Sequence, residues 1–194
     1  MRSIDKSNIT AVILAGGQSS RMNGEDKGLI LLKNKPLISY VVDVVVKKVA
    51  SILVSANRNI DLYQEFGKVI TDELSDFQGP LAGISAAMDK SSTKYLLVLP
   101  CDGPFINSEL IDRLVLEMER NNGKICVASD GDRMHPTFAL INTDLKNDLS
   151  KFLDDGNRKL GLWFRNNNAI EVDFSDQIDV FINLNSPEDF KISD

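Results

Sequence analysis

The residues best suited to chemistry lie within residues 15–28, directly after a short apolar run. Gly16 and Gly17 allow the backbone to turn sharply and to present bare N–H groups, as phosphate oxygens require. Arg21 and Lys27 add a bidentate guanidinium and a point charge to the same segment. The segment matches neither the Gly-x-Gly-x-x-Gly pattern nor the Gly-Lys-Ser/Thr ending of a Walker loop. These residues therefore indicate a phosphate-binding loop of another kind, and a flexible loop with solvated charges is the alternative.

Asp102 is the carboxylate best placed to act with these cations. It follows the apolar residues 95–99, which predict a buried strand, and so stands where a parallel sheet binds its ligands. A hard carboxylate there suits Mg²⁺, which takes only one or two protein carboxylates when it bridges phosphates. The structural alternatives are a loop-capping role for Asp102, an ion pair with Asp26 for Lys27 and a solvated surface position for Arg21.

The apolar pattern predicts the elements that position these residues. Short apolar runs predict strands, and runs with the helical period predict helices. The predicted strands are residues 9–14, 51–56, 68–71, 95–99, 125–128, 137–141, 170–174 and 181–184. The predicted helices are residues 36–49, 61–66, 79–89, 144–153 and 160–165, one that starts at Asn107 or Ser108, and a terminal one capped at Ser186-Pro187. This alternation predicts an α/β fold in which a mostly parallel sheet is covered by helices on both faces.

Three loops of such a sheet have suitable chemistry for a site. Parallel sheets bind ligands at the carboxyl ends of their strands, at the point where the strand order reverses. The loops that follow Leu14, Ile70 and Leu99 meet this description. We therefore expect these three loops to meet at one edge of the sheet.

The charges are unevenly distributed along the chain. Its 194 residues contain 22 Lys and Arg against 28 Asp and Glu, for a formal net charge of −6. Residues 1–60 hold nine of the cations and four of the anions, a net charge of +5, and the remainder carries −11. An acidic chain argues against binding to nucleic acid or to a membrane surface, since both need a basic footprint. A basic first third is compatible with a small polyanionic ligand.

Membrane insertion, secretion and metal clusters find no support in the sequence. The longest apolar run, residues 95–101, is far short of a membrane span, and residues 1–6 contain no signal-peptide core. Cys101 and Cys126 are not paired in a Cys-x-x-Cys spacing, and His135 is the single histidine, so no zinc site or disulfide framework is indicated. No linker divides the chain, and we expect a single-domain cytoplasmic protein.

Several motifs together resemble a known family. Leu14-Ala15-Gly16-Gly17, Arg21-Met22 and Asp26-Lys27-Gly28 resemble the signature of nucleotidyltransferases with a Rossmann-like fold. Later blocks, in the same order, are similar to those of the molybdenum cofactor guanylyltransferases: Lys35-Pro36-Leu37, Ala56-Asn57-Arg58, Gly79-Pro80-Leu81-Ala82-Gly83, Pro100-Cys101-Asp102, His135-Pro136-Thr137, Val172-Asp173-Phe174-Ser175-Asp176 and Asn183-Leu184-Asn185-Ser186-Pro187. The resemblance covers essentially the whole chain.

This resemblance implies an activity and an organisation. The family transfers GMP from GTP to the terminal phosphate of the molybdenum-loaded molybdopterin cofactor, releases pyrophosphate and requires Mg²⁺. The implied organisation is one nucleotidyltransferase domain over residues 1–194, with the nucleotide bound by about residues 1–105 and the acceptor by about residues 106–194. The implied partners are GTP and molybdenum-molybdopterin, with transient contact with proteins that deliver the cofactor or mature molybdoenzymes.

The resemblance also implies roles for particular residues. Lys27, Arg21 and Asp102 would act on the triphosphate, with Asp102 as the metal ligand. The implied nucleotide-binding residues are Leu14, Ala15, Gly16, Gly17, Lys27, Ser55, Asp72, Gly79, Pro80, Leu81, Gly83 and Asp102. Ser55 is a departure, because the family usually has Asn there and serine lacks the amide donor. His135 would lie towards the acceptor, without a role in proton transfer.

Competing interpretations come from the same class and from other classes. A related nucleotidyltransferase would use CTP or another phosphate acceptor. A non-catalytic nucleotide-binding module is a different class, and the presence of both Lys27 and Asp102 argues against it. A nicotinamide oxidoreductase is disfavoured because the dinucleotide glycine pattern is missing.

Overall fold

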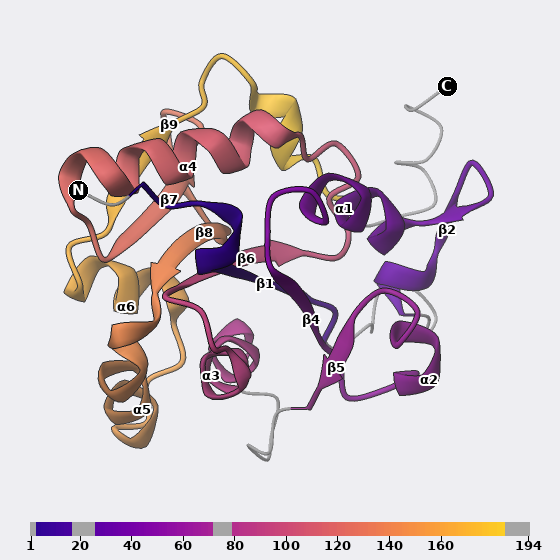
Figure 1. Ribbon diagram of the computed structural model, residues 1–194, viewed down its shortest axis with the longest axis horizontal. Helices are drawn as coiled ribbons and strands as arrows, with labels where there is room; N and C mark the ends of the chain where they lie inside the picture. Colours follow the sequence, from indigo (N-terminus) through magenta and orange to yellow (C-terminus); the bar gives the residue numbers. More distant parts are fainter. Residues whose placement is uncertain (1–2, 17–25, 72–78, 185–194) are drawn as a thin grey trace.

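A seven-stranded sheet forms the centre of the molecule in the computed structural model, which describes residues 3–16, 26–71 and 79–184 (Figure 1). In spatial order its strands are β5 (Lys68–Ile70), β4 (Ser51–Ser55), β1 (Ile9–Leu14), β6 (Tyr95–Pro100), β8 (Met134–Asn142), β7 (Ile125–Ser129) and β9 (Ile170–Asp173). β8 runs antiparallel to both neighbours, and every other pairing in the sheet is parallel. The expected mostly parallel sheet is therefore confirmed.

Helices cover both faces of the sheet because its strands are apolar on both sides. Alternate residues of a strand point to opposite faces. Ile13 packs with α1 (Leu37–Val45) and α4 (Ser108–Asn121), whereas its neighbour Val12 packs with α3 (Pro80–Lys90), α5 (Lys146–Asp154) and α6 (Leu160–Asn166). Figure 1 shows α4 and α1 on one side of the sheet and α3, α5 and α6 on the other. No helix within the described residues has the length and apolarity needed to cross a membrane.

The helix boundaries follow local signals in the sequence. Asn107 caps α4, and its side chain accepts a hydrogen bond of 3.0 Å from the N–H of Leu110. Gly79, at φ +70°, precedes Pro80 at the first position of α3.

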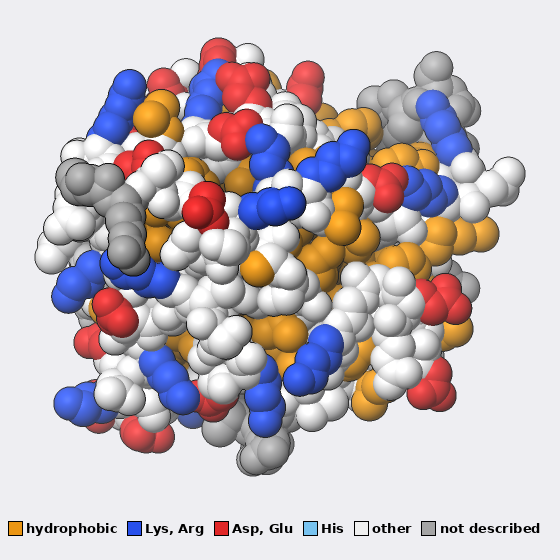
Figure 2. Space-filling model, in the orientation of Figure 1, with side chains coloured by type: hydrophobic (Ala, Val, Ile, Leu, Met, Phe, Trp, Pro, Cys, Tyr) orange, Lys and Arg blue, Asp and Glu red, His pale blue; other side chains and the backbone are white. Residues whose placement is uncertain are grey.

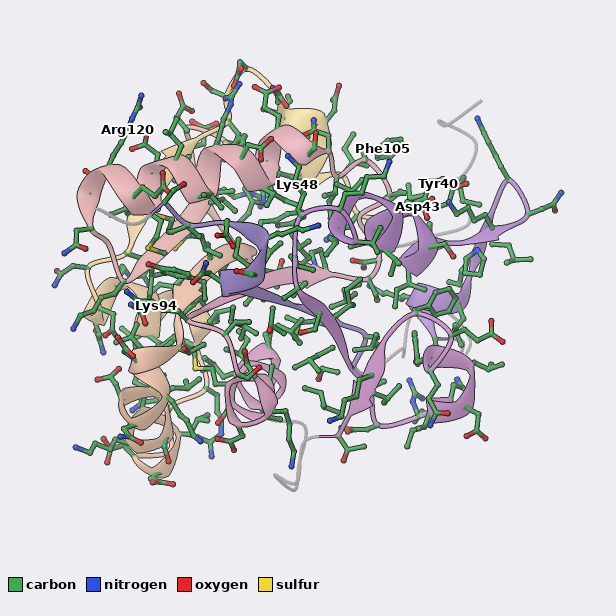
Figure 3. All side chains as sticks on the ribbon, in the orientation of Figure 1. Tyr40, Asp43, Lys48, Lys94, Phe105 and Arg120 are labelled. Atoms are coloured by element: carbon green, nitrogen blue, oxygen red, sulfur yellow. The ribbon has the colours of Figure 1, made fainter. Side chains whose placement is uncertain are left out.

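Lys48 lies between α1 and α4 in Figure 3, where its ammonium pairs with Asp112 at 2.7 Å.

Two predicted helices are shorter in the structure. The prediction of residues 36–49 was too long, because α1 ends at Val45 and a turn follows, which lets the N–H of Ala50 bond to Ile9 O at 2.8 Å and start β4. In place of a helix over residues 61–66 the structure has the single-turn α2 (Ile60–Tyr63).

The prediction of a strand at residues 181–184 is wrong. A 3₁₀ helix, η4 (Ile178–Phe181), occupies its start, and the chain then runs extended without joining the sheet. Leu184 instead packs against Leu32 and Leu37, and its N–H donates to Asp102 O at 3.1 Å. These apolar residues anchor the segment rather than extend a sheet face. The predicted terminal helix from Ser186-Pro187 lies outside the described residues.

The β8 strand begins earlier than predicted. The predicted strand starts at residue 137, yet β8 includes Met134, His135 and Pro136. The register against β7 shifts between Val127 and Ala128, so the proline falls in an irregular stretch of the ladder. A bulge of this kind accommodates proline within a sheet.

A short hairpin, β2 (Leu31–Leu32) with β3 (Lys35–Pro36), leads into α1. Lys33 and Asn34 between the strands both have positive φ, at 49° and 62°, as a tight hairpin turn requires.

On the face shown in Figure 2, basic and acidic side chains are mixed rather than gathered into one basic stripe.

Candidate active site

The ends of three parallel strands meet at one edge of the sheet. Leu14 at the end of β1 is in register with Ser55 of β4 on one side and with Pro100 of β6 on the other. The backbone continues the pairing beyond the strands: Ala15 N–H donates to Ser55 O at 2.9 Å, and Cys101 N–H donates to Leu14 O at 3.2 Å. The chain leaves β1 towards β4 on one side and returns as β6 on the other, so this edge is the reversal point in strand order where such sheets bind ligands.

Lys27 and Asp102 face each other at this edge. Lys27 begins the 3₁₀ helix η2 (Lys27–Leu29), and its ammonium lies 3.5 Å from Asp102 Oδ2. Asp102 is only 8 % exposed, and burial raises the pKa of its carboxyl, while the nearby ammonium of Lys27 lowers it. An ion pair with Asp26 was the alternative for Lys27 from the sequence, whereas its ammonium pairs with Asp102 in the structure.

Asp102 suits a magnesium ion that also binds phosphates. Among the described residues, no group of three or more His, Cys, Asp or Glu side chains is arranged to hold a metal by itself. Mg²⁺ at phosphate-transfer sites usually takes one or two carboxylates and completes its shell with phosphate oxygens and water. A single buried carboxylate beside a lysine matches that kind of site and does not match an all-protein cage.

Asp26, the residue before Lys27, is held by Arg58 and Asn59. Its side chain is buried, with Arg58 Nη2 donating to Oδ1 at 3.1 Å and Asn59 Nδ2 donating to Oδ2 at 2.5 Å. Both donors belong to the segment between β4 and α2. Sequence reasoning singled out the Ala56-Asn57-Arg58 block only for its resemblance and did not anticipate this contact.

Gly28 packs tightly on the segment after β6. A Cβ at Gly28 would lie 2.9 Å from the hydroxyl oxygen of Tyr63 and 3.1 Å from Cys101 Cβ. Only glycine therefore allows η2 to approach Cys101 this closely. Cys101 is buried, and burial raises the pKa of its thiol, so its role is packing rather than nucleophilic attack.

The start of α3 lies beside the same edge. Gly83, in its second turn, is buried, and a Cβ there would lie 2.5 Å from Ser55 Oγ and 3.1 Å from Leu14 Cδ2. Ser55 is itself 5 % exposed. The small side chains at positions 55 and 83 thus let the helix approach the ends of β4 and β1, with exposed Gly79 and Pro80 at its open end.

Comparison with known proteins identifies the family. The family model described as "MobA-like NTP transferase domain" matches residues 11–169. The chain belongs to the MobA-like NTP transferase family. It is 45 % identical over 181 residues to a molybdenum cofactor guanylyltransferase of Shewanella sediminis, covering 93 % of this chain and 92 % of that one. It is 44 % identical over 184 residues to the protein of the same name in Histophilus somni (strain 2336), covering 94 % of each.

Solved structures agree on the fold. The molybdopterin-guanine dinucleotide biosynthesis protein A of Archaeoglobus fulgidus superposes with a TM-score of 0.76 at 22 % identity, over 95 % of this chain and 96 % of that one. A nucleotidyl transferase of Methanothermobacter thermautotroptrophicus gives a TM-score of 0.73 at 20 % identity, over 95 % of each chain. The sheet of this MobA-like NTP transferase is thus the Rossmann-like sheet that the motifs predicted.

Some predicted site residues of this MobA-like NTP transferase fall outside the described residues: Gly17, Arg21 and Asp72. Ala15 is buried and Gly16 is exposed at the end of β1, as a loop that offers its backbone to a ligand requires. The structure therefore brings together the described members Leu14, Ala15, Gly16, Lys27, Ser55, Leu81, Gly83 and Asp102, with Gly79 and Pro80 at the rim.

His135 is the second residue of β8, at the same edge of the MobA-like sheet. Its ring is stacked on Phe181, with centroids 3.9 Å apart, and its Nε2 is 2.7 Å from Asp130 Oδ2. The N–H of Arg133 and the ring of His135, which both bond to the Asp130 carboxylate, hold the pKa of Asp130 well below its usual range. These contacts give His135 a structural role in joining η4 to the sheet.

Proposed function

We propose that this chain is a molybdenum cofactor guanylyltransferase. It transfers GMP from GTP to the terminal phosphate of molybdenum-molybdopterin and forms molybdopterin guanine dinucleotide and pyrophosphate. The observation that carries the proposal is the Lys27–Asp102 pair at the reversal point of the sheet, in a chain 45 % identical to a relative of that name. We further propose that it acts in the cytoplasm.

The reaction needs alignment and charge neutralisation more than a protein nucleophile. A phosphate oxygen of the acceptor attacks the α-phosphorus of GTP. The new P–O bond forms as the bond from the α-phosphorus to the oxygen bridging to the β-phosphate breaks, and pyrophosphate leaves with the electron pair. Because the acceptor brings its own nucleophile, the protein contributes by holding both reactants and by stabilising the charge that moves to the leaving group.

The proposed roles follow the chemistry of each side chain. Lys27 and Arg21, with the backbone N–H groups of Gly16 and Gly17, hold the triphosphate and the departing pyrophosphate. Asp102 would hold Mg²⁺, which when bound neutralises phosphate charge. The ammonium of Lys27, 3.5 Å from the Asp102 carboxylate, places a positive charge where phosphate oxygens approach that carboxylate.

The nucleoside is proposed to lie along α3. The exposed Gly79 and Pro80 at its start offer backbone to the guanine, the buried Leu81 packs behind them in the core, and Asp72 and Ser55 complete the contacts with the nucleotide. In this arrangement about residues 1–105 bind GTP and about residues 106–194 bind the pterin acceptor within one domain. Any contact with proteins that deliver or collect the cofactor would be transient.

A product assay tests this function. The protein is incubated with molybdenum-loaded molybdopterin, Mg²⁺ and GTP, CTP, ATP or UTP in turn, and both pyrophosphate and the dinucleotide are measured, with a control lacking the acceptor. We expect both products with GTP alone and only when the acceptor is present. Products with CTP instead would assign a different nucleotide, and tight GTP binding without pyrophosphate release would identify a binding module.

A further inference from the structure

Asp26 and Gly28, the residues on either side of Lys27, both contact the segment of residues 58–63. On one side of Lys27, the Asp26 carboxylate accepts hydrogen bonds from Arg58 and Asn59. On the other side, Gly28 packs against the hydroxyl group of Tyr63, with no room for a Cβ. Both residues that flank Lys27 in the chain are therefore held in place by residues 58–63.

The Asp26 carboxylate bonds to Arg58 and Asn59 and does not cap its own 3₁₀ helix, η2. It occupies the position before the first residue of η2, where Asp side chains often cap a helix, but it makes no capping hydrogen bond. Its backbone O accepts the N–H of Leu29 at 2.9 Å, while the carboxylate turns away to Arg58 and Asn59. The side chain thus links two segments that are about thirty residues apart in the sequence.

Asn59 joins this contact to the rest of the segment. It has a left-handed backbone, with φ at 49°, which asparagine tolerates better than most residues. Its backbone O accepts the N–H groups of Leu62 and Tyr63 at 3.0 and 3.1 Å and so starts α2, while its side chain reaches Asp26. Asn59 thereby connects the Asp26 contact to the turn that carries Tyr63.

Charge explains why the contact matters for Lys27. Asp26 and Asp102 are both buried, and a buried carboxylate strongly favours a cationic partner. Arg58 satisfies Asp26, which leaves the ammonium of Lys27 directed at Asp102, 3.5 Å away. Without Arg58, the buried Asp26 carboxylate would lack its cation, and we expect it to draw the ammonium of its chain neighbour Lys27 away from Asp102.

We infer that residues 58–63 form a clasp, defined by Arg58, Asn59 and Tyr63, that positions Lys27 towards Asp102 and the triphosphate. Arg58 and Asn59 are positioning residues: they act through Asp26 and not on the substrate. This inference rests on the proposed function for the part played by the triphosphate, whereas the packing of Lys27 against Asp102 is independent of it.

A suppressor experiment tests the clasp. Arg58→Ala is compared with the double variant Arg58→Ala/Asp26→Asn and with Arg120→Ala, a control that removes an exposed ion-paired arginine on α4. We expect the KM for GTP to rise about tenfold or more in Arg58→Ala, with a smaller change in kcat. In the double variant, which removes the competing carboxylate, the KM should return most of the way to the wild-type value. Arg120→Ala should leave it unchanged.

Two results would overturn the clasp. If Arg58→Ala behaves like Arg120→Ala, Arg58 does not position Lys27. If the double variant is as impaired as Arg58→Ala, Arg58 acts directly on the nucleotide and not through Asp26. Melting temperatures show whether each variant is folded, and Asn59→Gly provides a second, milder variant, because glycine keeps the left-handed backbone and removes only the side-chain donor.

Hydrogen exchange separates this inference from the proposed function. The amides of Leu29 and Ile30 bond to Asp26 and Lys27 in η2, at 2.9 and 3.2 Å. We expect them to exchange faster in Arg58→Ala and in Asn59→Gly than in the wild type, without any substrate present. Unchanged exchange would overturn the clasp whatever the product assay shows. Faster exchange in a protein that makes no dinucleotide would support the clasp and reject the proposed function.

Discussion

Replacing Gly83 with alanine puts a methyl group between α3 and the end of β4. The new Cβ would lie 2.5 Å from Ser55 Oγ and 3.1 Å from Leu14 Cδ2, both well inside van der Waals contact. Overpacking of this kind costs about 1–3 kcal/mol. Against it, replacing a helical glycine by alanine gains about 0.4–1 kcal/mol, because the unfolded chain loses conformational freedom. We therefore expect a net loss of stability of about 0–2.6 kcal/mol.

Gly161 in α6 provides the matched control. A Cβ there would meet nothing closer than Pro136 Cγ at 3.9 Å, which is an ordinary contact. Gly161→Ala should therefore stabilise the protein by the propensity gain alone, about 0.4–1 kcal/mol. The difference between the two variants isolates the overpacking cost, roughly 1–3 kcal/mol.

Urea unfolding and thermal melting followed by circular dichroism measure this difference. In a chain of this size 1 kcal/mol shifts the melting temperature by about 2–4 °C, so the two variants should separate clearly. Adding Ser55→Ala to Gly83→Ala removes the closest contact and should restore part of the loss. Equal stabilisation by Gly83→Ala and Gly161→Ala would refute the close approach of α3 to Ser55.

Three further predictions concern the site and its surroundings. The Asp102→Asn variant should melt near the wild-type temperature, yet its kcat should fall by about a hundredfold or more. The Lys27→Ala variant should have a KM for GTP raised by about tenfold or more. Both constants are measured by pyrophosphate release, and wild-type kinetics in either variant would reject the role of the residue replaced. Tyr63→Phe should leave the unfolding free energy unchanged or raise it by about 1 kcal/mol, because the buried hydroxyl has no hydrogen-bond partner among the described residues; a clear loss in urea unfolding would contradict this. Asp130→Asn should be less stable than the wild type at neutral pH, since the lowered pKa of Asp130 stabilises the fold above the unfolded value of about 4. That difference should shrink as the pH falls below about 4, and a constant difference in melting temperature down to acid pH would show that the Asp130 charge is not its source.

The edge of the sheet was predictable because strands and their ends follow a local pattern. Apolar runs ending at Leu14, Ile70 and Leu99 located three strands, and parallel pairing brings such ends together without any knowledge of side-chain contacts. Asp102 was found in this way, since a carboxylate directly after a buried strand stands out in the sequence.

Contacts between distant side chains were not predictable in the same way. Asp and Arg are residue types that usually lie at the surface. Only the folded chain shows that the Asp26 carboxylate is buried and that the Arg58 guanidinium reaches it. The fit of Gly83 against Ser55 is likewise set by how closely a helix approaches a strand, which periodicity does not encode. The mistaken strand at residues 181–184 has a related cause, because an apolar run does not reveal whether it extends a sheet or fills a hole beside one.

The place of β8 in the sheet has a consequence for how the protein is made. Residues 9–102 supply β5, β4, β1, β6 and Asp102, and so the main strands and the carboxylate of the candidate GTP-binding edge are made before β7 and β8 have been translated. Until β8 arrives, β6 has an open edge whose residues 96–99 are apolar and fully buried in the finished fold. An unpaired apolar edge invites association with other chains. We therefore expect that a truncation after about residue 105 would aggregate, although it retains Lys27 and Asp102, and that the nascent chain needs protection at β6 until the β7–β8 hairpin covers it.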